Sequence, residues 1–303
     1  MNRPRYKYLR ISVTNRCDLS CRYCRSECLF KNKKDQAWSF KDIITSVKVL
    51  KGFGISHIRL TGGEPLLYKE LPQLIGVLRL HCKSITVTTN GTRLEGMAKD
   101  LRLAGLNNIN VHIDTADAKK YKWLTGGDVS AIIRGIKSAK KAGILLKLNT
   151  VLLRGINYDE IDSLIDLAVS IGAPLRLIEL MPFCEPEFYK RHFVGMQSIF
   201  EKLHLMPIND TFGMGPAEYY KDRKRGAVIG IISPLTRKFC GYCDRLRLTS
   251  NGVLKRCLAD EEGLSLSACS FNKVLIEEYM SAKEYDHKDF LGAEDHSLRS
   301  IGG

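Results

Sequence analysis

Short apolar segments alternate with longer amphipathic segments through the first half of the chain. The short segments are rich in β-branched residues, which predicts strands. The longer ones repeat apolar residues every three or four positions, which predicts helices. The expected strands span residues 8–13, 55–61, 84–89, 108–114, 145–151 and 175–180. A first helix is expected after Ser39, and later helices are expected at residues 71–80, 94–104, 129–142 and 158–171.

The helix after Ser39 has a clear start, face and end in the sequence. Ser39 and Asp42 have the spacing of a capping box, in which each side chain bonds the backbone of the other residue. Gly52 and Gly54 are expected to end the helix. Its apolar residues fall on one face at helical spacing: Phe40, Ile43, Ile44, Val47 and Leu50.

Six such β/α units with parallel strands predict an α/β fold, an incomplete (β/α)6 barrel of the TIM type. Active-site loops of such barrels follow the carboxyl ends of the strands. Beyond residue 184 the alternation stops, and a short helix at 193–205 and strands at 226–233 and 246–249 predict a C-terminal α+β module. We therefore expect two domains, a barrel over residues 1–184 and a module over 185–303 packed against it.

Composition narrows the class of protein. The chain has 303 residues, 47 Lys and Arg against 33 Asp and Glu, and a formal net charge of +14. It has no apolar run near the ~20 residues of a membrane span and no apolar signal stretch at its start, so we expect a cytoplasmic protein rather than a disordered, membrane-spanning or secreted one. The charge favours an anionic partner, but the basic clusters are scattered and leave its identity open.

Six of the ten cysteines form two groups of three. Three thiolates suit an iron–sulfur cubane that keeps one iron free for a ligand. A structural zinc site wants four ligands, which Cys28 could complete in the first group and Cys269 in the second, so spacing alone leaves zinc open. The groups are spaced C-x3-C-x2-C and C-x2-C-x13-C: Cys17, Cys21 and Cys24, then Cys240, Cys243 and Cys257.

The residues around the first group resemble the radical S-adenosylmethionine (radical SAM) enzymes. The segment CDLSCRYC at 17–24 has an aromatic residue, Tyr23, before its last cysteine, and LTGGEPLL at 60–67 ends a predicted strand. The resemblance implies that the three thiolates hold a [4Fe-4S] cluster whose free iron binds S-adenosylmethionine. It also implies that Tyr23 contacts this cofactor and that the backbone of Gly62, Gly63 and Glu64 lines its methionine end.

The second half is similar to the GTP 3',8-cyclase family of molybdenum cofactor biosynthesis. The similarity rests on FCGYCDRLRLTSNGVLKRCL at 239–258 and on the final IGG at 301–303. It implies a second [4Fe-4S] cluster on Cys240, Cys243 and Cys257, whose open iron binds the guanine base. The implied GTP-binding residues are Arg10, Arg59, Thr88, Lys147, Arg245, Leu246 and Arg247; the implied S-adenosylmethionine contacts are His112, Arg176 and Met181; and the implied catalytic residues are Arg247, Gly302 and Gly303.

Four positions depart from the pattern of that family. His112 stands where the family usually has a serine that touches S-adenosylmethionine, and His57 where a lysine often helps to bind phosphate. Tyr68 and His296 each replace an arginine. We interpret His112 as a tolerated substitution rather than a new catalyst. The other three departures weaken the positive field around a triphosphate.

The resemblance implies that a 5'-deoxyadenosyl radical takes hydrogen from ribose C3' of GTP, which gives 3',8-cyclo-7,8-dihydro-GTP. It implies GTP and a reducing electron donor as partners, cyclic pyranopterin monophosphate synthase as the downstream enzyme, and a homodimer, with no nucleic acid and no membrane. One alternative is a radical SAM enzyme with an auxiliary cluster that modifies a peptide, although such modules usually carry more than three clustered cysteines. The other is a non-enzymatic zinc protein that binds nucleic acid through its basic surface.

Overall fold

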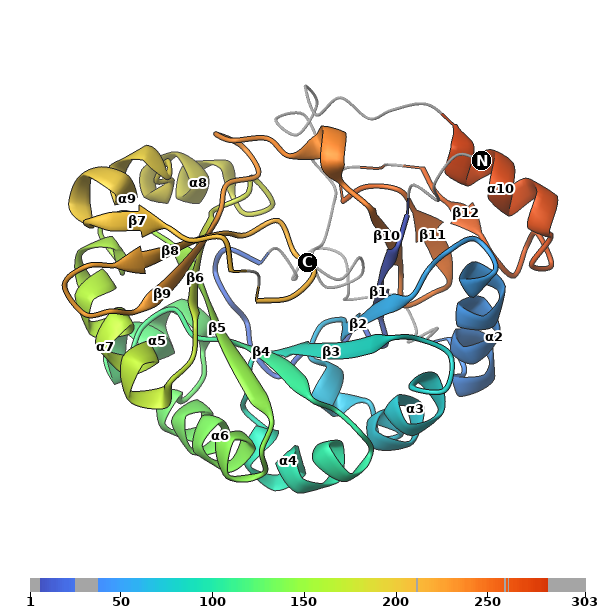
Figure 1. Ribbon diagram of the computed structural model, residues 1–303, viewed down its shortest axis with the longest axis horizontal. Helices are drawn as coiled ribbons and strands as arrows, with labels where there is room; N and C mark the ends of the chain where they lie inside the picture. Colours follow the sequence, from blue (N-terminus) through green and yellow to red (C-terminus); the bar gives the residue numbers. More distant parts are fainter. Residues whose placement is uncertain (1–5, 25–37, 211, 259, 261, 283–303) are drawn as a thin grey trace.

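Six parallel strands form the frame of the molecule, and each pairs in register with the next. The computed structural model describes residues 6–24, 38–210, 212–258, 260 and 262–282. The incomplete (β/α)6 barrel expected from the sequence is confirmed (Figure 1). Its strands are β1 (Tyr8–Ser12), β2 (His57–Thr61), β3 (Ser84–Thr89), β4 (Asn108–His112), β5 (Leu145–Leu152) and β6 (Leu175–Glu179).

Amphipathic helices cover the outer face of these strands (Figure 1). The capping box before the first of them is confirmed, because the amide of Asp42 donates to the hydroxyl of Ser39 at 3.2 Å. The 3-10 helices η1 (Pro65–Leu67) and η2 (Tyr158–Glu160) extend two of the connections. The outer helices are α2 (Phe40–Lys51), α3 (Leu71–Leu78), α4 (Leu94–Leu103), α6 (Val129–Lys141) and α7 (Ile161–Ile171).

One helix of the barrel half was not expected. Helix α5 (Ala118–Thr125) begins at Asp117, whose carboxylate accepts from the amide of Lys120 at 2.8 Å. It ends at Gly126, which has the left-handed backbone that glycine adopts readily. The helix is short and mostly polar, so its apolar periodicity is weak.

The strands of the second half extend the barrel sheet at both of its edges rather than forming a separate sheet. Strand β9 (Val228–Ile232) pairs parallel with β6, and β10 (Arg245–Leu248) pairs parallel with β1. The sheet then continues through β8 (Glu218–Asp222) and β7 (Leu205–Pro207) on one side, and through β11 (Val253–Lys255) and β12 (Leu264–Ser265) on the other. The expected domain boundary at residue 184 stays a prediction, since the sheet is continuous across it.

Helices and one turn complete the second half. Helix α9 (Gln197–Lys202) matches the short helix expected near residues 193–205, whereas α8 (Pro186–His192) was not expected. Helix α10 (Lys273–Ser281) follows the last strand, and the 3-10 turn η3 (Cys240–Tyr242) contains Cys240 and is followed directly by Cys243. The mixture of strands and short helices agrees with the α+β character expected of this half.

Alternation along the strands separates an apolar core from a polar interior. Leu9 and Ile11 are fully buried between the sheet and the helices. Arg10 lies between them in sequence and therefore faces the inside of the barrel. Arg59 on β2 and Arg176 on β6 line the interior in the same way. The apolar core thus lies outside the barrel strands, and the inside is left for polar chemistry.

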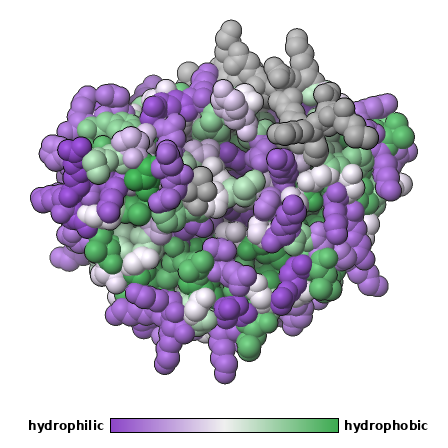
Figure 2. Space-filling model, in the orientation of Figure 1, coloured by the Kyte–Doolittle hydropathy of each residue, from purple (hydrophilic) through white to green (hydrophobic). Residues whose placement is uncertain are grey.

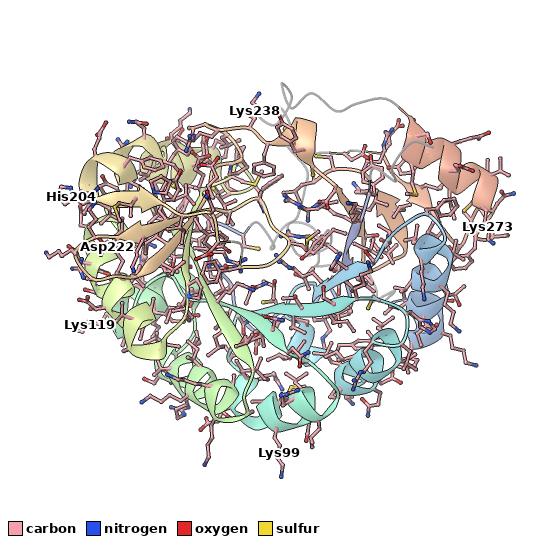
Figure 3. All side chains as sticks on the ribbon, viewed as in Figure 1. Lys99, Lys119, His204, Asp222, Lys238 and Lys273 are labelled. Atoms are coloured by element: carbon pink, nitrogen blue, oxygen red, sulfur yellow. The ribbon has the colours of Figure 1, made fainter. Side chains whose placement is uncertain are left out.

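The outer surface is hydrophilic. Purple side chains dominate the periphery of the face shown in Figure 2, and the exposed Lys99, Lys119 and Lys273 project outward from helices in Figure 3. Among the residues that the structure describes, no helix is long and apolar enough to cross a membrane, and the longest, α6, has 13 residues.

Candidate active site

A cavity of about 320 Å³ lies inside the barrel, at the carboxyl ends of its strands. This volume is in the range of small-molecule sites. Of the residues that the sequence singled out, this cavity gathers all six clustered cysteines, together with Arg10, Tyr23, Arg59, Gly62, Gly63, Thr88, His112, Arg176, Met181, Arg245 and Arg247.

Some expected site residues lie elsewhere. Glu64, Lys147 and Leu246 are not among the residues that line the cavity. Leu246 is fully buried in the sheet, where it pairs with Leu9. Gly302 and Gly303, like Cys28 and His296, lie outside the described residues.

The first cysteine loop is fixed by the backbone of the segment after β2. The amide of Gly63 donates to the carbonyl of Thr14 at 2.7 Å, and the amide of Glu64 donates to the carbonyl of Arg16 at the same distance. A Cβ atom on Gly63 would lie 2.1 Å from the carbonyl oxygen of Arg16, and one on Gly62 would lie 2.3 Å from that of Thr14. Only glycine allows this close approach of the two backbones.

The opposite side of the same loop is attached to α5. The amide of Ser20 donates to the carbonyl of Thr125, and the amide of Arg22 donates to that of Leu124, both at 2.9 Å. The guanidinium of Arg22 also lies over the ring of Trp123, 4.4 Å from its centroid. The unexpected helix therefore holds the cysteine loop in place.

Glu64 supports this region from below rather than facing the cavity. Its fully buried carboxylate accepts hydrogen bonds from the amide of Leu66, the hydroxyl of Thr89 and the amide of Asn90 at 2.6 to 2.9 Å. Burial raises the pKa of Glu64 to about 7, and these three hydrogen bonds oppose the rise. The side chain thereby ties the end of β2 to the end of β3.

The thiols of the two groups line the same cavity, and thiol chemistry suits iron–sulfur clusters. Burial raises the pKa of the Cys21 thiol well above its usual range, and the nearby Cys24 adds to this effect. Such a thiol becomes a thiolate when a cationic metal centre binds it. Cys269 does not line the cavity and donates to the carbonyl of Leu266 at 3.4 Å. This placement disfavours a zinc ribbon completed by Cys269.

Cys82 and Cys184 also lie apart from both groups. Cys82 donates to the carbonyl of Leu78 at the end of α3 at 3.0 Å, so its thiol packs against a helix end. Burial raises the pKa of the Cys82 thiol to about 11. Cys184 is buried in a small apolar cluster next to the barrel.

Three arginines lie side by side inside the barrel. Arg10 on β1 pairs in register with Arg247 on β10 and with Arg59 on β2, and all three line the cavity. Burial and the charges of Arg247 and Arg59 lower the pKa of Arg10 well below its usual value. Burial also lowers the pKa of Arg247 to about 10. Buried cations in a row destabilise one another, so an anionic ligand would stabilise them.

A second row crosses β4, β5 and β6. His112 pairs in register with Asn149, and Asn149 pairs with Arg176. Burial and the charge of Arg59 lower the pKa of Arg176 to about 10. Arg176 in the second row is therefore close enough to the first row to be repelled by its charge. Lys147 lies one layer below, where burial and the charges of Arg176 and Arg59 lower its pKa to about 8.

Sequence reasoning missed several residues of the cavity. Asn149 and Glu179 line it, and Asp114 lies buried behind His112 with hydrogen bonds to that ring and to Tyr23. The side chain of Phe239 lies under the guanidinium of Arg245, 5.0 Å from its ring centroid. A usable signal was present for Asp114 and Glu179, because both lie at the carboxyl end of a predicted strand. Asn149 lies inside its strand and gave no such signal.

The fold, the cysteine loop and the cavity together define a radical SAM enzyme with a second cysteine group. Residues 11–168 match the family model of the radical SAM superfamily, and residues 173–288 match that of Molybdenum Cofactor Synthesis C. The structure of Streptococcus suis SuiB bound to precursor peptide SuiA aligns with a TM-score of 0.65 over 96% of this chain and 67% of that chain. At 17% identity, this likeness concerns the fold.

Two curated relatives are more similar in sequence. A GTP 3',8-cyclase from Clostridium botulinum is 38% identical over 266 residues, which cover 86% of this chain and 83% of that protein. One from Brucella canis is 36% identical over 312 residues, which cover 97% and 90%. The chain therefore belongs to the radical SAM superfamily and, within it, to the family of GTP 3',8-cyclases.

Proposed function

We propose that the chain is a GTP 3',8-cyclase, which converts GTP to 3',8-cyclo-7,8-dihydro-GTP in the first step of molybdenum cofactor biosynthesis. One observation carries the proposal: two groups of three cysteines and a row of buried arginines line the same cavity. This arrangement suits a cofactor at one cluster and an anionic nucleotide at the other.

In this proposal each group of cysteines binds a [4Fe-4S] cluster. Cys17, Cys21 and Cys24 bind the cluster that takes S-adenosylmethionine. The cofactor then lies against Tyr23, Gly62, Gly63, His112, Arg176 and Met181, all of which line the cavity. When bound, the reduced cluster and the cofactor supply the 5'-deoxyadenosyl radical.

The arginine rows bind the triphosphate. Arg10, Arg59 and Arg247 lie abreast, and Arg245 lies near them on β10. Forked guanidinium donors match phosphate oxygens, and a triphosphate with about four negative charges offsets the repulsion within the row. Thr88 contributes a hydroxyl from β3. Lys147 and Leu246 support the site from outside the cavity lining, Lys147 through its charge beside Arg176 and Leu246 by anchoring β10 against β1.

The second cysteine group and Arg247 act together on the base and ribose. The charges of Cys257 and Cys243 raise the pKa of Arg247 against the effect of its burial, which supports a position of this arginine close to the second cysteine group. Arg247 is thus suited to orient the ribose and to donate a hydrogen bond during cyclisation. The catalytic contribution expected of Gly302 and Gly303 is part of the proposal but lies outside the described residues.

We further propose that the enzyme works in the cytoplasm as a homodimer. It takes electrons from a reducing donor and delivers its product to cyclic pyranopterin monophosphate synthase. The arginines that line the cavity support binding of GTP, because they offer cations to a triphosphate inside the barrel.

Anaerobic reconstitution with iron and sulfide tests the proposal. The protein should bind about eight irons per chain, and with S-adenosylmethionine, dithionite and GTP it should form 5'-deoxyadenosine and a cyclised isomer of GTP. ATP and a peptide serve as control substrates and should give no modified product. Formation of 5'-deoxyadenosine together with a modified peptide would support the peptide-modifying alternative, and protein that binds zinc alone would contradict both readings.

A further inference from the structure

The connection between β9 and β10 carries two cysteines of the second group. It spans residues 233–244 and includes Cys240 and Cys243. Because β9 pairs with β6 and β10 pairs with β1, this connection joins the two edges of the six-stranded barrel. Figure 1 shows it in orange, passing from the side of β9 to β10. The position of both cysteines therefore depends on how the connection is attached to the barrel.

Glu179, the last residue of β6, attaches the connection near its β9 end. The residue is buried, and its Oε2 accepts from the amides of Leu235 and Thr236 at 3.0 and 3.1 Å. Its Oε1 accepts from the hydroxyl of Thr236 and from the amide of Met196 at 3.3 Å. A carboxylate only accepts hydrogen bonds, so four donors suit it. The carboxylate thus holds the connection against the end of β6.

The segment held by Glu179 also packs beside the third cysteine of the group. Leu235 packs against a small apolar cluster formed by Phe183 and Leu258, and Cys257 packs against the same cluster. Cys257 directly precedes Leu258 in the chain. Fixing Leu235 therefore fixes the connection relative to the segment that carries the third thiol.

The other end of the connection is attached through the backbone. The carbonyl of Asp244 accepts from the amides of Lys7 and Tyr8 at 3.0 and 3.2 Å. Near the β9 end, Arg237 also pairs with Glu218 on β8, but both side chains are more than half exposed, so this pair contributes little. The buried carboxylate at the end of β6 is therefore the main side-chain attachment that we assign to the β9 end.

We propose that Glu179 is a positioning residue for the second iron–sulfur cluster. It holds Leu235 and Thr236, and through their backbone it keeps the three thiols of the second group at the spacing of one cluster. Partners behind the ligands of a metal site commonly orient those ligands in this way. Glu179 is not itself a ligand in this account. The proposal rests on the second cluster of the family and does not depend on the reaction with GTP.

Release of iron from the second cluster tests the proposal. Cys24→Ala removes a ligand of the first cluster, and the reconstituted variant should keep about four irons per chain. In this background, Glu179→Leu leaves the amides of Leu235 and Thr236 without their acceptor. We expect a ferrous chelator to remove iron about tenfold faster than from Cys24→Ala alone, the effect of losing hydrogen bonds to a charged group.

Thr236 allows a milder change at the other end of the same contact. Thr236→Val, also in the Cys24→Ala background, removes the hydroxyl and keeps the amide, so iron should leave about threefold faster. Thr236→Ser keeps the hydroxyl and should restore the slow release. Unchanged release in both Glu179→Leu and Thr236→Val would overturn the proposal.

The same substitution at a second buried carboxylate is the matched control. Glu64 is also fully buried and accepts several hydrogen bonds, but it lies beside the first cysteine loop. In the Cys24→Ala background, Glu64→Leu should leave the release of iron from the second cluster as it is. Acceleration by Glu64→Leu equal to that by Glu179→Leu would contradict a specific role of Glu179.

The first cluster provides the reciprocal measurement. Cys240→Ala leaves only the first cluster, and Glu179→Leu in that background should not change its release of iron. Equal acceleration at both clusters would indicate a general loss of stability and refute the proposal. So would a Cys24→Ala protein without iron, because no second cluster would then exist. None of these measurements requires turnover, so they remain informative if the protein forms no cyclised GTP.

Discussion

At the scale of single residues, the sequence predicts the site residues that belong to a motif. It does not predict those that only the three-dimensional structure brings to the site. The cysteines, Gly62 and Gly63 follow motif spacings, and the arginines match family positions, so all could be predicted. Asp114 could not, because its role appears only when β4 brings it behind His112 and the cysteine loop brings Tyr23 to it. The contact of the Glu64 backbone with the cofactor stays a prediction, and the role of its carboxylate beneath the cavity was not foreseen.

Loss of one arginine from the row should weaken GTP binding and stabilise the empty protein. Arg59 is 9% exposed and lies beside Arg10, so Arg59→Met removes a charge-assisted contact to phosphate and also a source of repulsion. We expect GTP to bind about tenfold to a hundredfold more weakly, and the midpoint of thermal unfolding to rise by about 2 °C or more. Calorimetric titration and anaerobic thermal scans measure the two effects.

A surface arginine provides the control for this prediction. Arg134 on α6 is exposed and pairs with Glu95, and Arg134→Met should leave GTP binding as it is. Unchanged GTP affinity in Arg59→Met would contradict the assignment of the arginine row to the triphosphate.

Lys147 should make stability depend on pH in the alkaline range. Its pKa is lowered from 10.5 to about 8 in the folded protein. Below about pH 8, Lys147 is therefore charged in both the folded and the unfolded protein, and burial of this charge destabilises the folded protein in full. As the pH rises from 8 toward 10.5, the folded state loses its proton first and this cost is relieved. Lys147→Met should therefore be more stable than wild type near neutral pH, by a margin that shrinks above about pH 8.

Thermal unfolding across this pH range measures that margin. Lys137→Met, on the exposed face of α6, is the control, and its difference from wild type should stay constant. A margin for Lys147→Met that grows with pH would contradict the placement of this ammonium among buried cations.

At the scale of elements, apolar periodicity predicted the helices of several turns and the strands with several alternating residues. It missed α5 and α8, which have 8 and 7 residues and little apolar repeat. It also could not foresee that β10 pairs with β1, because strand partners far apart in sequence leave no local pattern. Yet this pairing brings the second cysteine group to the same cavity as the first.

The contact between the glycine turn after β2 and the cysteine loop should be required for the first cluster. A Cβ atom in Gly63→Ala would lie 2.1 Å from the carbonyl oxygen of Arg16 and must displace the loop. We expect bound iron to fall from about eight to about four per chain and cleavage of S-adenosylmethionine to cease. Gly76→Ala, in α3 with open space around the new methyl group, should keep the full iron content. Retention of about eight irons by Gly63→Ala would contradict the account.

The segment from η3 to β11 should be required for the conversion of GTP but not for the cleavage of S-adenosylmethionine. Cys240→Ala should also lower iron to about four per chain, but the first cluster should remain able to cleave S-adenosylmethionine without forming cyclised GTP. Cys269→Ala is the matched control, since Cys269 does not line the cavity. Iron analysis and product chromatography distinguish the two variants. Loss of iron in Cys269→Ala would instead support a metal site in which Cys269 is a ligand.

At the scale of the whole molecule, one continuous sheet brings both halves of the chain to one cavity. The strands after residue 184 lie at both edges of the barrel, so the two cysteine groups and the arginine row share an interior that the outer helices enclose. An enclosed site limits the access of water to the reaction. The central claim is therefore that cofactor and GTP meet in this cavity, with ribose C3' next to the adenosyl group.

Transfer of deuterium tests that claim most directly. The reconstituted enzyme is incubated anaerobically with dithionite, S-adenosylmethionine and GTP deuterated at C3', and the 5'-deoxyadenosine is analysed by mass spectrometry. The account predicts one deuterium in 5'-deoxyadenosine and none left at C3' of the cyclised product. Unlabelled 5'-deoxyadenosine formed alongside cyclised GTP would contradict it.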